Sequence, residues 1–193
     1  MSRRELRMVT GNRHKFLEAR LILAEFQVDL LQVDAKRLEI QAEDVEEVAR
    51  FSAEDAARRL GGPLIVEDAG LFIHHLGGFP GPYSSYVLRT IGLEGVLRLM
   101  KGASDRRAHF KSAIAFCEAP GRTPRVFTGV VEGVISKERR GEKGFGYDPI
   151  FIPLEGDGRT FAEMETEEKG RLSHRGRALR KFAEWFTRMY ENI

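Results

Sequence analysis

Short apolar runs alternate with longer amphipathic segments along the first third of the chain. The apolar run at 6–9 predicts a strand, and the run at 28–33 predicts another. Between them, from Arg13 to about Glu25, apolar side chains recur over one broad helical face without an interrupting Gly or Pro. Strand, helix and strand in this order are typical of a βαβ unit, so the pattern predicts an α/β fold.

A second amphipathic helix is expected from Asp44 to Leu60, after a polar connector at 36–41. Gly and Pro at 61–63 end this helix, because they supply a left-handed cap and lack a backbone donor. The fully apolar run at 64–66 then predicts a short strand buried within a sheet.

Turn residues and long alternating strands follow in the rest of the chain. Gly and Pro at 77–83 are interleaved with Phe and Tyr, which favours an ordered loop over a linker. Alternation predicts two long strands at 108–118 and 126–135 that pair as an antiparallel hairpin. The remaining expected elements are helices at 85–91 and 93–100, a flexible charged loop at 137–146, a strand at 150–152, a short helix or turn at 161–169, and a helix from about His174 to Tyr190 capped by Ser173.

Length and charge narrow the class of protein. The chain has 193 residues, with 31 Lys+Arg against 29 Asp+Glu, and 42% of its residues are hydrophobic. One domain over residues 1–193 is expected at this length, and neither disorder nor a membrane protein fits the composition. The balanced charge argues against a protein that coats DNA. The single cysteine, Cys117, excludes an internal disulfide and a cysteine zinc cluster, and no signal peptide is evident, so we expect a soluble cytoplasmic enzyme.

The segment Thr10-Gly11-Asn12-Arg13-His14-Lys15 lies at a predicted strand-to-helix turn. A helix start presents unpaired backbone N–H groups and the positive end of the helix dipole, which favour phosphate. Thr10 and Asn12 add side-chain donors, and Lys15 can reach back from one turn inside. The P-loop pattern is absent. The alternative is an ordinary Asn cap with a solvated lysine.

Carboxylates are expected at the ends of separate elements. Glu39 lies in the polar connector, and Glu67-Asp68 directly follows the apolar run at 64–66. Ionised groups at the end of a buried strand are costly unless they emerge at a sheet edge or bind a cation. Magnesium takes one or two carboxylates together with substrate phosphates, so a Mg²⁺-assisted phosphate reaction is one interpretation. The alternative is that Asp68 only starts a turn.

Two further groups of residues are candidates for binding a base or an anion. In Gly144-Phe145-Gly146-Tyr147-Asp148-Pro149, two exposed aromatic rings and a carboxylate suit stacking on a base and bonding to its edge. Lys169 and Ser173-His174-Arg175 lie at the start of the last helix, which favours an anion. The alternatives are a turn whose aromatic rings fold into the core, and a Ser-capped helix with solvated His and Arg.

The remaining histidines and the cysteine suggest no chemistry by their spacing. His14, His74, His75 and His109 show no metal-ligand pattern along the chain. Cys117 lies in a predicted strand and is expected to be a small buried hydrophobe.

Read together, these motifs resemble the inosine/xanthosine triphosphate pyrophosphatase family. The resemblance runs through almost the whole chain: T-G-N-R-H-K at 10–15, E-I-Q at 39–41, V-E-D-A-G-L at 66–71, G-G-F-P-G-P-Y-S at 77–84, G-F-G-Y-D-P-I-F at 144–151, F-A-E-M at 161–164, and E-E-K-G-R-L-S-H-R-G-R-A-L at 167–179. It implies a long mixed central β-sheet with helices on two lobes and an active-site cleft between them. It also implies a homodimer, Mg²⁺ dependence, and hydrolysis of ITP, dITP or XTP to the monophosphate and pyrophosphate.

The resemblance also implies roles for individual residues. Asp68 would be the catalytic base for the attacking water, and Glu39 and Asp68 would hold the metal. Phe145 would stack on the purine. The substrate-binding residues implied are Thr10, Gly11, Asn12, Arg13, His14, Lys15, Ala69, Phe145, Gly146, Tyr147, Asp148, Lys169, His174 and Arg175. The chain departs from the family pattern at Ala69, where Ser is common, and at Ser84-Ser85, where some relatives have a basic residue.

Three other functions compete with this interpretation. A dinucleotide-dependent oxidoreductase would need a G-x-G-x-x-G after the first strand, which the chain lacks. A nucleic-acid binding module is suggested only by the pairs Arg106-Arg107 and Arg139-Arg140, which are expected in solvated loops. A pyrophosphatase of the same fold could act on another modified nucleotide, such as a pyrimidine triphosphate. We expect no nucleic-acid partner and no membrane partner.

Overall fold

The computed structural model describes residues 4–36 and 38–191. Its strands are β1 (Arg4–Val9), β2 (Val28–Val33), β3 (Leu64–Ile73), β4 (Pro80–Gly81), β5 (Arg107–Cys117), β6 (Arg125–Ile135) and β7 (Phe151–Pro153). Its α-helices are α1 (Arg13–Ala24), α2 (Val45–Leu60), α3 (Ser84–Thr90), α4 (Gly92–Leu99), α5 (Thr166–Leu172) and α6 (His174–Glu191). Short 3₁₀ helices are η1 (His74–Leu76), η2 (Asp148–Ile150) and η3 (Phe161–Glu163). In the part of the chain so described, no helix has both the length and the apolar character needed to cross a bilayer.

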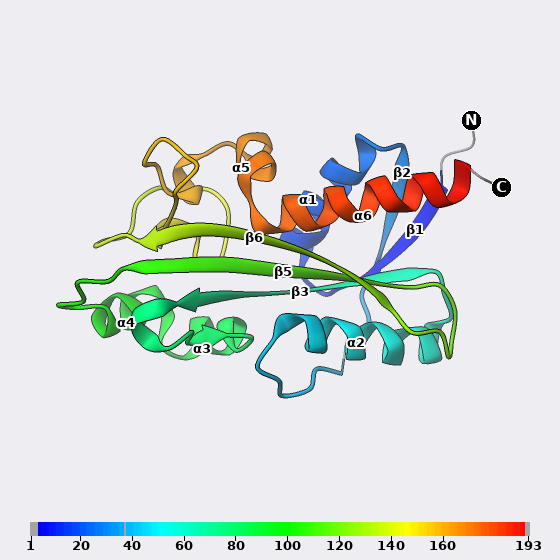
Figure 1. Ribbon diagram of the computed structural model, residues 1–193, viewed down its shortest axis with the longest axis horizontal. Coiled ribbons are helices and arrows are strands. Elements are labelled where there is room, and N and C mark those ends of the chain that lie inside the picture. Colours follow the sequence, from blue (N-terminus) through cyan, green and yellow to red (C-terminus); the bar gives the residue numbers. More distant parts are fainter. Residues whose placement is uncertain (1–3, 37, 192–193) are drawn as a thin grey trace.

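The strands form one mixed sheet in the order β2-β1-β3-β5-β6-β7, with β4 beside β3 (Figure 1). β1 pairs in parallel with β2 and β3, as the predicted βαβ unit requires, and the other pairings are antiparallel. β5 and β6 are the predicted long hairpin, which is confirmed. The α/β class and the long mixed central sheet are therefore also confirmed.

Helices cover both faces of the sheet. α1 and α6 pack together on one face, where their apolar side chains join Leu6, Ile65 and Ile114, and α2 lies on the opposite face (Figure 1). α2 presents Ala49, Ala53 and other small residues to the sheet, so it can approach closely. α3 and α4 lie at the other end of the long strands, against a second apolar cluster. This arrangement leaves the middle of β3 between the two groups of helices.

The strand predicted at 64–66 is longer in the structure, so the predicted end of this strand is wrong. β3 runs to Ile73 and pairs with β5 along its whole length, from Leu64 opposite Cys117 to Ile73 opposite Ala108. Glu67 and Asp68 therefore lie within the strand and not after it. The strand continues because Leu71 and Ile73 are again apolar and buried, and because the charge of Glu67 is compensated, as described below.

The Gly/Pro stretch at 77–83 is an ordered loop, as expected. β4 passes so close to β3 that a Cβ on Gly70 would lie 2.4 Å from the carbonyl oxygen of Gly81. Ser84 fastens the loop, because its hydroxyl accepts the N–H of Leu71 at 2.9 Å and donates to the Gly81 carbonyl at 2.7 Å. The loop therefore holds the start of α3 against the middle of the sheet.

Candidate active site

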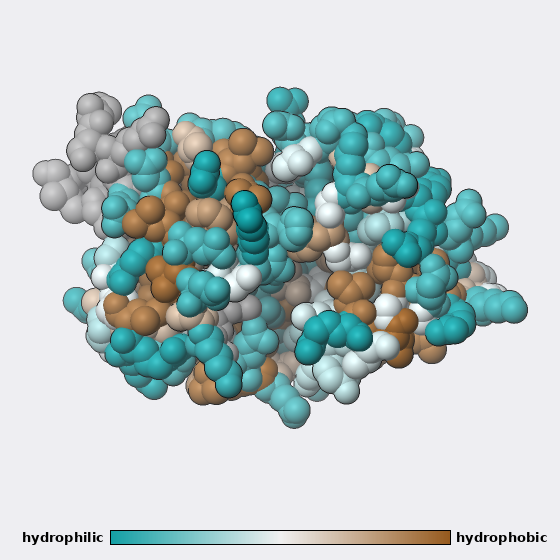
Figure 2. All heavy atoms as spheres, turned by 180° about the vertical axis from the view of Figure 1, so that it is seen from behind, coloured by the Kyte–Doolittle hydropathy of each residue, from teal (hydrophilic) through white to brown (hydrophobic). Residues whose placement is uncertain are grey.

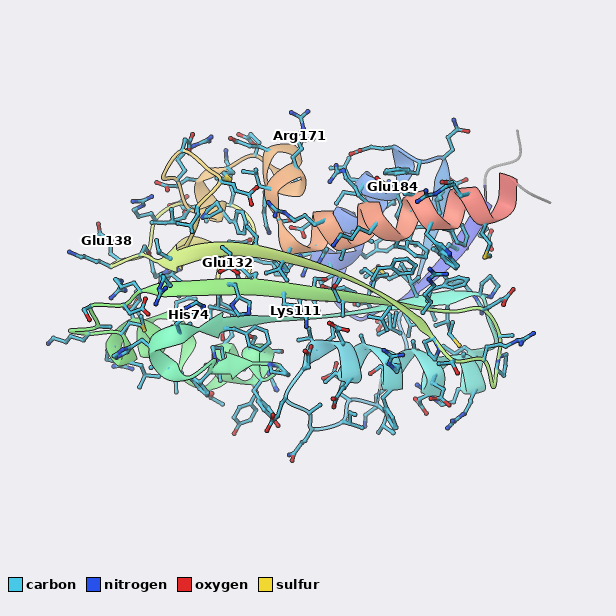
Figure 3. All side chains as sticks on the ribbon, viewed as in Figure 1. His74, Lys111, Glu132, Glu138, Arg171 and Glu184 are labelled. Atoms are coloured by element: carbon cyan, nitrogen blue, oxygen red, sulfur yellow. The ribbon has the colours of Figure 1, made fainter. Side chains whose placement is uncertain are left out.

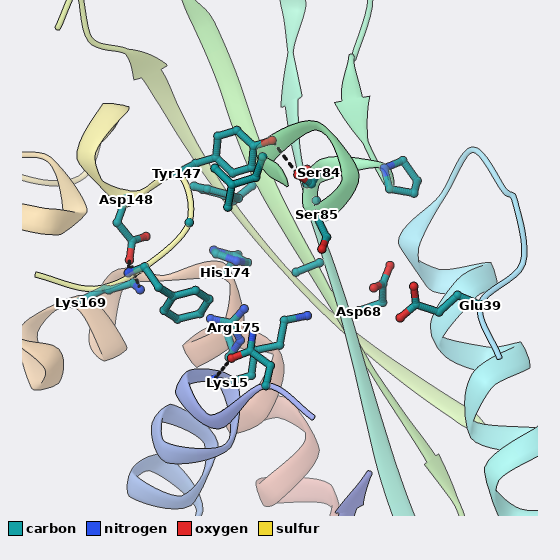
Figure 4. Close-up of a pocket in the computed structure, with 18 residues that line it drawn as sticks. Lys15, Glu39, Asp68, Ser84, Ser85, Tyr147, Asp148, Lys169, His174 and Arg175 are labelled. Atoms are coloured by element: carbon teal, nitrogen blue, oxygen red, sulfur yellow. Dashed lines mark hydrogen bonds and ion pairs between the residues drawn. The ribbon is translucent and has the colours of Figure 1, made fainter. Parts of the chain in front are cut away.

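The predicted residues from both ends of the chain meet in one pocket beside β3 (Figure 4). Those that line it are Asn12, Lys15, Glu39, Asp68, Ala69, Phe145, Gly146, Tyr147, Asp148, Lys169, His174 and Arg175. Seen from behind, the surface of the molecule is hollowed near its middle (Figure 2). The segments that line the pocket include the start of α1, the connector before α2, the strands β3 and β5, the helices α3, α5 and α6, and the segment around the start of η2.

The turn at 10–13 begins α1 at the edge of this pocket. Thr10 is buried and its hydroxyl accepts the N–H of Asn12 at 3.1 Å. Asn12 caps the helix by accepting the N–H of Lys15 at 3.1 Å. Thr10 thus shapes the turn, while Asn12 and Lys15 face the pocket. Gly11, Arg13 and His14 are exposed and do not line the pocket.

Glu67 is the centre of a buried charge network. Its side chain is fully buried, its Oε2 lies 2.7 Å from Lys15 Nζ, and its Oε1 accepts from Arg175 Nε at 3.1 Å. Ser112 on β5 also donates to Oε1 at 2.8 Å. Burial alone would raise the pKa of Glu67, but Arg175 and Lys15 outweigh it and hold that pKa far below its usual range. Glu67 is therefore ionised and fixes both cations.

The sequence left open whether Glu67 binds a metal ion, and in the structure Lys15 and Arg175 compensate its charge instead. Neighbouring residues in a strand point to opposite faces of the sheet. Glu67 points to the face covered by α1 and α6, whereas Asp68 points to the α2 side and toward Glu39 (Figure 4). The partners of Glu67 are therefore cations of the protein itself.

Glu18 was missed by the sequence analysis. Its carboxylate binds Lys169 Nζ at 2.7 Å and also pairs with Arg175. Burial would raise the pKa of Glu18, but Arg175 and Lys169 lower it. The available signal was its position three residues after Lys15, which places the two side chains on the same face of α1.

Phe145 lies under two cations at the pocket wall. Lys169 Nζ is 4.7 Å and Arg175 Cζ is 5.3 Å from the centre of its ring. His14 stacks on Phe145 with ring centres 5.2 Å apart. Asp148 holds the same segment, because it accepts the N–H of Phe145 at 2.8 Å and binds Lys169 at 2.6 Å. One half-buried aromatic ring is thus presented in a fixed orientation.

The prediction of two exposed aromatic rings is wrong for Tyr147. This ring is 5% exposed, and its hydroxyl donates to the carbonyl of Ser84 at 2.7 Å. Burial raises its pKa, so the phenol stays protonated. Tyr147 supports the pocket wall from the apolar cluster beneath it, which leaves Phe145 as the accessible ring.

Residues at the start of α6 are buried, so the alternative of solvated His and Arg is wrong. Ser173 caps the helix by accepting the N–H of Gly176 at 3.0 Å, as predicted. His174 is 3% exposed and stacks on Phe110 with ring centres 4.4 Å apart. Burial, with Arg175 beside it, lowers the pKa of His174 well below its usual value, so the ring is neutral. Its buried Nδ1 has no hydrogen-bond partner among the residues described.

Asp68 and Glu39 face each other on one side of the pocket, and the cations lie on its other side (Figure 4). Asp68 is 8% exposed and comes from β3, and Glu39 is exposed and comes from the connector before α2. Two converging carboxylates supply the hard oxygen donors that Mg²⁺ prefers, so this donor set fits that ion. The pocket therefore has a cationic side and an anionic side.

The two departures from the family pattern occupy the same pocket. Ala69 lines it without a hydroxyl, and the hydroxyl of Ser84 is engaged with the backbone of the Gly/Pro loop. Ser85 is exposed and lines the pocket next to it. Positions 84 and 85 therefore present no basic side chain to the pocket, and Ser85 is the exposed polar group there.

Known proteins are similar to this chain in sequence and in fold. The sequence pattern of the Ham1 family matches residues 6–185. A dITP/XTP pyrophosphatase of Methanothermobacter marburgensis is 54% identical over 96% of this chain and 97% of its own, and one of Methanopyrus kandleri is 52% identical over 92% and 93%. The solved structure of a HAM1 protein from Coxiella burnetii has a TM-score of 0.85 at 32% identity and covers 96% of this chain and 99% of that chain. This chain therefore belongs to the Ham1 family, and the resemblance seen in its sequence is confirmed.

Proposed function

We propose that this protein hydrolyses deaminated purine nucleoside triphosphates (dITP, ITP and XTP) to the monophosphate and pyrophosphate. The observation that carries the proposal is the charge separation within one pocket, with Lys15, Lys169 and Arg175 on one side and Glu39 and Asp68 on the other. The names of the relatives in M. marburgensis and M. kandleri support it.

The cationic side suits the triphosphate. The start of α1 offers backbone N–H groups and a positive dipole end, and Asn12 and Lys15 lie there. Lys15 is held by Glu67, yet an ammonium group has three donors, so two remain for phosphate oxygens. Binding would use a cation that is already positioned, without a large rearrangement of α1.

Glu39 and Asp68 would hold Mg²⁺, which when bound supplies charge neutralisation at the phosphate oxygens. The chain's own contribution to the chemistry is Asp68. It is largely buried beside the pocket, and its carboxylate can accept the proton of a water molecule held next to it. The water would attack a phosphorus atom in line with the leaving pyrophosphate, and Lys15 would offset the charge of the phosphate oxygens.

The base would stack on Phe145, with its edge toward Arg175 and His174. Hypoxanthine and xanthine have a 6-keto acceptor, to which Arg175 or a backbone N–H can donate. Adenine has an amino donor at that position and would leave two donors facing each other. Because such mismatches are costly in a buried site, they discriminate strongly. The unpaired Nδ1 of the neutral His174 is a further polar atom at this edge that a ligand can satisfy.

Product analysis of dITP turnover tests the reaction, and Asp68→Asn tests the base. We expect equal amounts of dIMP and pyrophosphate in the presence of Mg²⁺, and dIDP with phosphate would overturn the proposed bond cleavage. The Asp68→Asn variant should keep its fold and still bind ITP while losing most turnover. The matched control is Asp157→Asn, at an exposed ion pair with Arg159 away from the pocket. Unchanged turnover in Asp68→Asn would remove Asp68 from the role of base.

The resemblance also supports three broader proposals. They are a single domain over residues 1–193 whose two lobes share the sheet, a homodimer, and a cytoplasmic location. Light scattering of the purified protein tests the dimer, with twice the chain mass of 21.9 kDa as the expected value.

A further inference from the structure

Three potential metal ligands meet outside the pocket, and they are His74 from η1, His109 from β5 and Glu132 from β6. Figure 3 labels His74 and Glu132, which lie near each other at one end of the sheet. One donor atom from each lies within 4.8 Å of the donor atoms of the other two. The proposed nucleotide pocket uses none of the three.

The sheet itself brings these side chains together. His109 lies directly opposite Glu132 in the β5–β6 pairing and opposite Phe72 in the β3–β5 pairing. Directly paired residues project from the same face of a sheet. Phe72 lies flat on the His109 ring, with centres 5.0 Å apart and an interplanar angle of 2°. His109 is therefore held in one orientation by rigid elements.

His74 completes the group from the end of β3. It is the first residue of η1, directly after the strand, and its ring meets His109 edge-on with centres 5.8 Å apart. His74 and Glu132 are exposed, and His109 is half-buried. Tetrahedral zinc bonds of 2.0–2.1 Å place ligand atoms about 3.4 Å apart, so the two exposed side chains must close in slightly on the fixed His109.

Glu132 supplies a carboxylate charge within the group. The nearby cations are already paired. Lys111 binds Asp44 at 2.8 Å and Glu46 at 2.7 Å, and Arg107 binds Asp105 at 2.8 Å.

We propose that His74, His109 and Glu132 form a second metal site, which takes a transition-metal dication such as Zn²⁺. Two imidazoles and one carboxylate are a donor set suited to zinc and its neighbours, whereas Mg²⁺ prefers oxygen ligands. Asp68 precedes Phe72 by four residues on β3, or about 13 Å of strand, so the two sites are separate. Water would fill the remaining positions on the metal.

Calorimetric titration of the full chain with Zn²⁺ tests the proposal. Excess Mg²⁺ is present throughout, so that sites with oxygen ligands are already filled. We expect one zinc ion per chain in the wild type. The affinity for zinc should be at least about 10-fold weaker in His74→Ala, in His109→Ala and in Glu132→Gln, because even the loss of a group that only hydrogen-bonds to a metal ligand lowers metal affinity about 10- to 100-fold. The matched control is His75→Ala, since His75 is the exposed neighbour of His74 and is not part of the group.

Two results would overturn the site. One is wild-type zinc affinity in both His74→Ala and His109→Ala, and the other is an equal loss in His75→Ala. Circular dichroism and thermal unfolding without zinc check that each variant is folded. Because His74 is exposed, its variant tests the site even where the half-buried His109 variant is destabilised.

Discussion

Glu67→Gln is the most informative single change, because it removes the charge at the centre of the buried network and leaves its shape. The amide oxygen of the introduced side chain would still accept the hydrogen bond of Ser112. The amide would not neutralise Lys15 and Arg175, whose side chains are 15% and 4% exposed. Breaking a buried ion pair by removing one partner costs about 3–5 kcal/mol. Unfolding at neutral pH should therefore lose about this much free energy.

The matched control is Glu155→Gln, the same substitution in an exposed ion pair. Glu155 binds Arg177 at 2.6 Å, but its side chain is 57% exposed. Exposed pairs contribute about 0–1 kcal/mol, so this variant should be close to wild type. In a domain of this length each kcal/mol shifts the Tm by about 2–4 °C, which predicts a loss of about 6–20 °C for Glu67→Gln.

Nucleotide should partly reverse the loss. In the variant, Lys15 lacks its anion until a triphosphate supplies one, whereas Arg175 still pairs with Glu18. An ITP analogue with a methylene group between the α and β phosphates should thus raise the Tm of Glu67→Gln more than that of the wild type. Chemical denaturation and calorimetry measure both effects. A loss in Glu67→Gln no greater than in Glu155→Gln would refute the reasoning that burial makes this carboxylate essential.

Two further predictions concern the base and the pH dependence of stability. Phe145→Ala removes the ring on which we place the purine. Since stacking on an aromatic ring is worth about 1–3 kcal/mol per base, the KM for ITP should rise about 5- to 150-fold in steady-state assays, with little change in Tm. An unchanged KM would place the base elsewhere. Acidification should destabilise the protein in two ranges of pH. The lowered pKa of His174 means that the folded state resists protonation of this ring, so the free energy of unfolding should fall below about pH 6.5. The lowered pKa values of Glu18 and Glu67 should add a second decline below about pH 4.5. Urea unfolding between pH 5 and 7 should show that His174→Gln flattens the upper decline more than His109→Gln does, since His174 is the more buried ring, and an unchanged slope in His174→Gln would contradict this assignment.

Local patterns in the sequence were sufficient for most elements of the fold. Apolar spacing located α1, α2 and α6, and strict alternation located the β5–β6 hairpin. The caps at Asn12 and Ser173 were predictable because a short polar side chain before an amphipathic segment can accept the first free N–H groups. These features depend on residues within a few positions of one another.

The errors arose where distant residues decide the outcome. An acidic pair after three apolar residues is typical of a strand end, because an ionised side chain inside a sheet is costly. β3 continues through Glu67 because Arg175, 108 residues away, pairs with it. Tyr147 is buried because its hydroxyl meets the carbonyl of Ser84, 63 residues away. Neither partner can be identified from local spacing.

The proposed zinc site also depends on residues that are distant from one another in the sequence. His74, His109 and Glu132 show no ligand spacing along the chain. The pairing of β3, β5 and β6 places Phe72, His109 and Glu132 side by side, and η1 adds His74. Only the register of the sheet shows that these side chains can share an ion.

Discrimination between ITP and ATP tests the proposed function most directly. These substrates differ at position 6 of the purine, where one has a keto acceptor and the other an amino donor. With Mg²⁺ present, pyrophosphate release by the wild-type protein should give a kcat/KM for ITP at least about 100-fold above that for ATP, because the wrong edge leaves buried donors unpaired. Hydrolysis of ITP no faster than that of ATP would contradict the account.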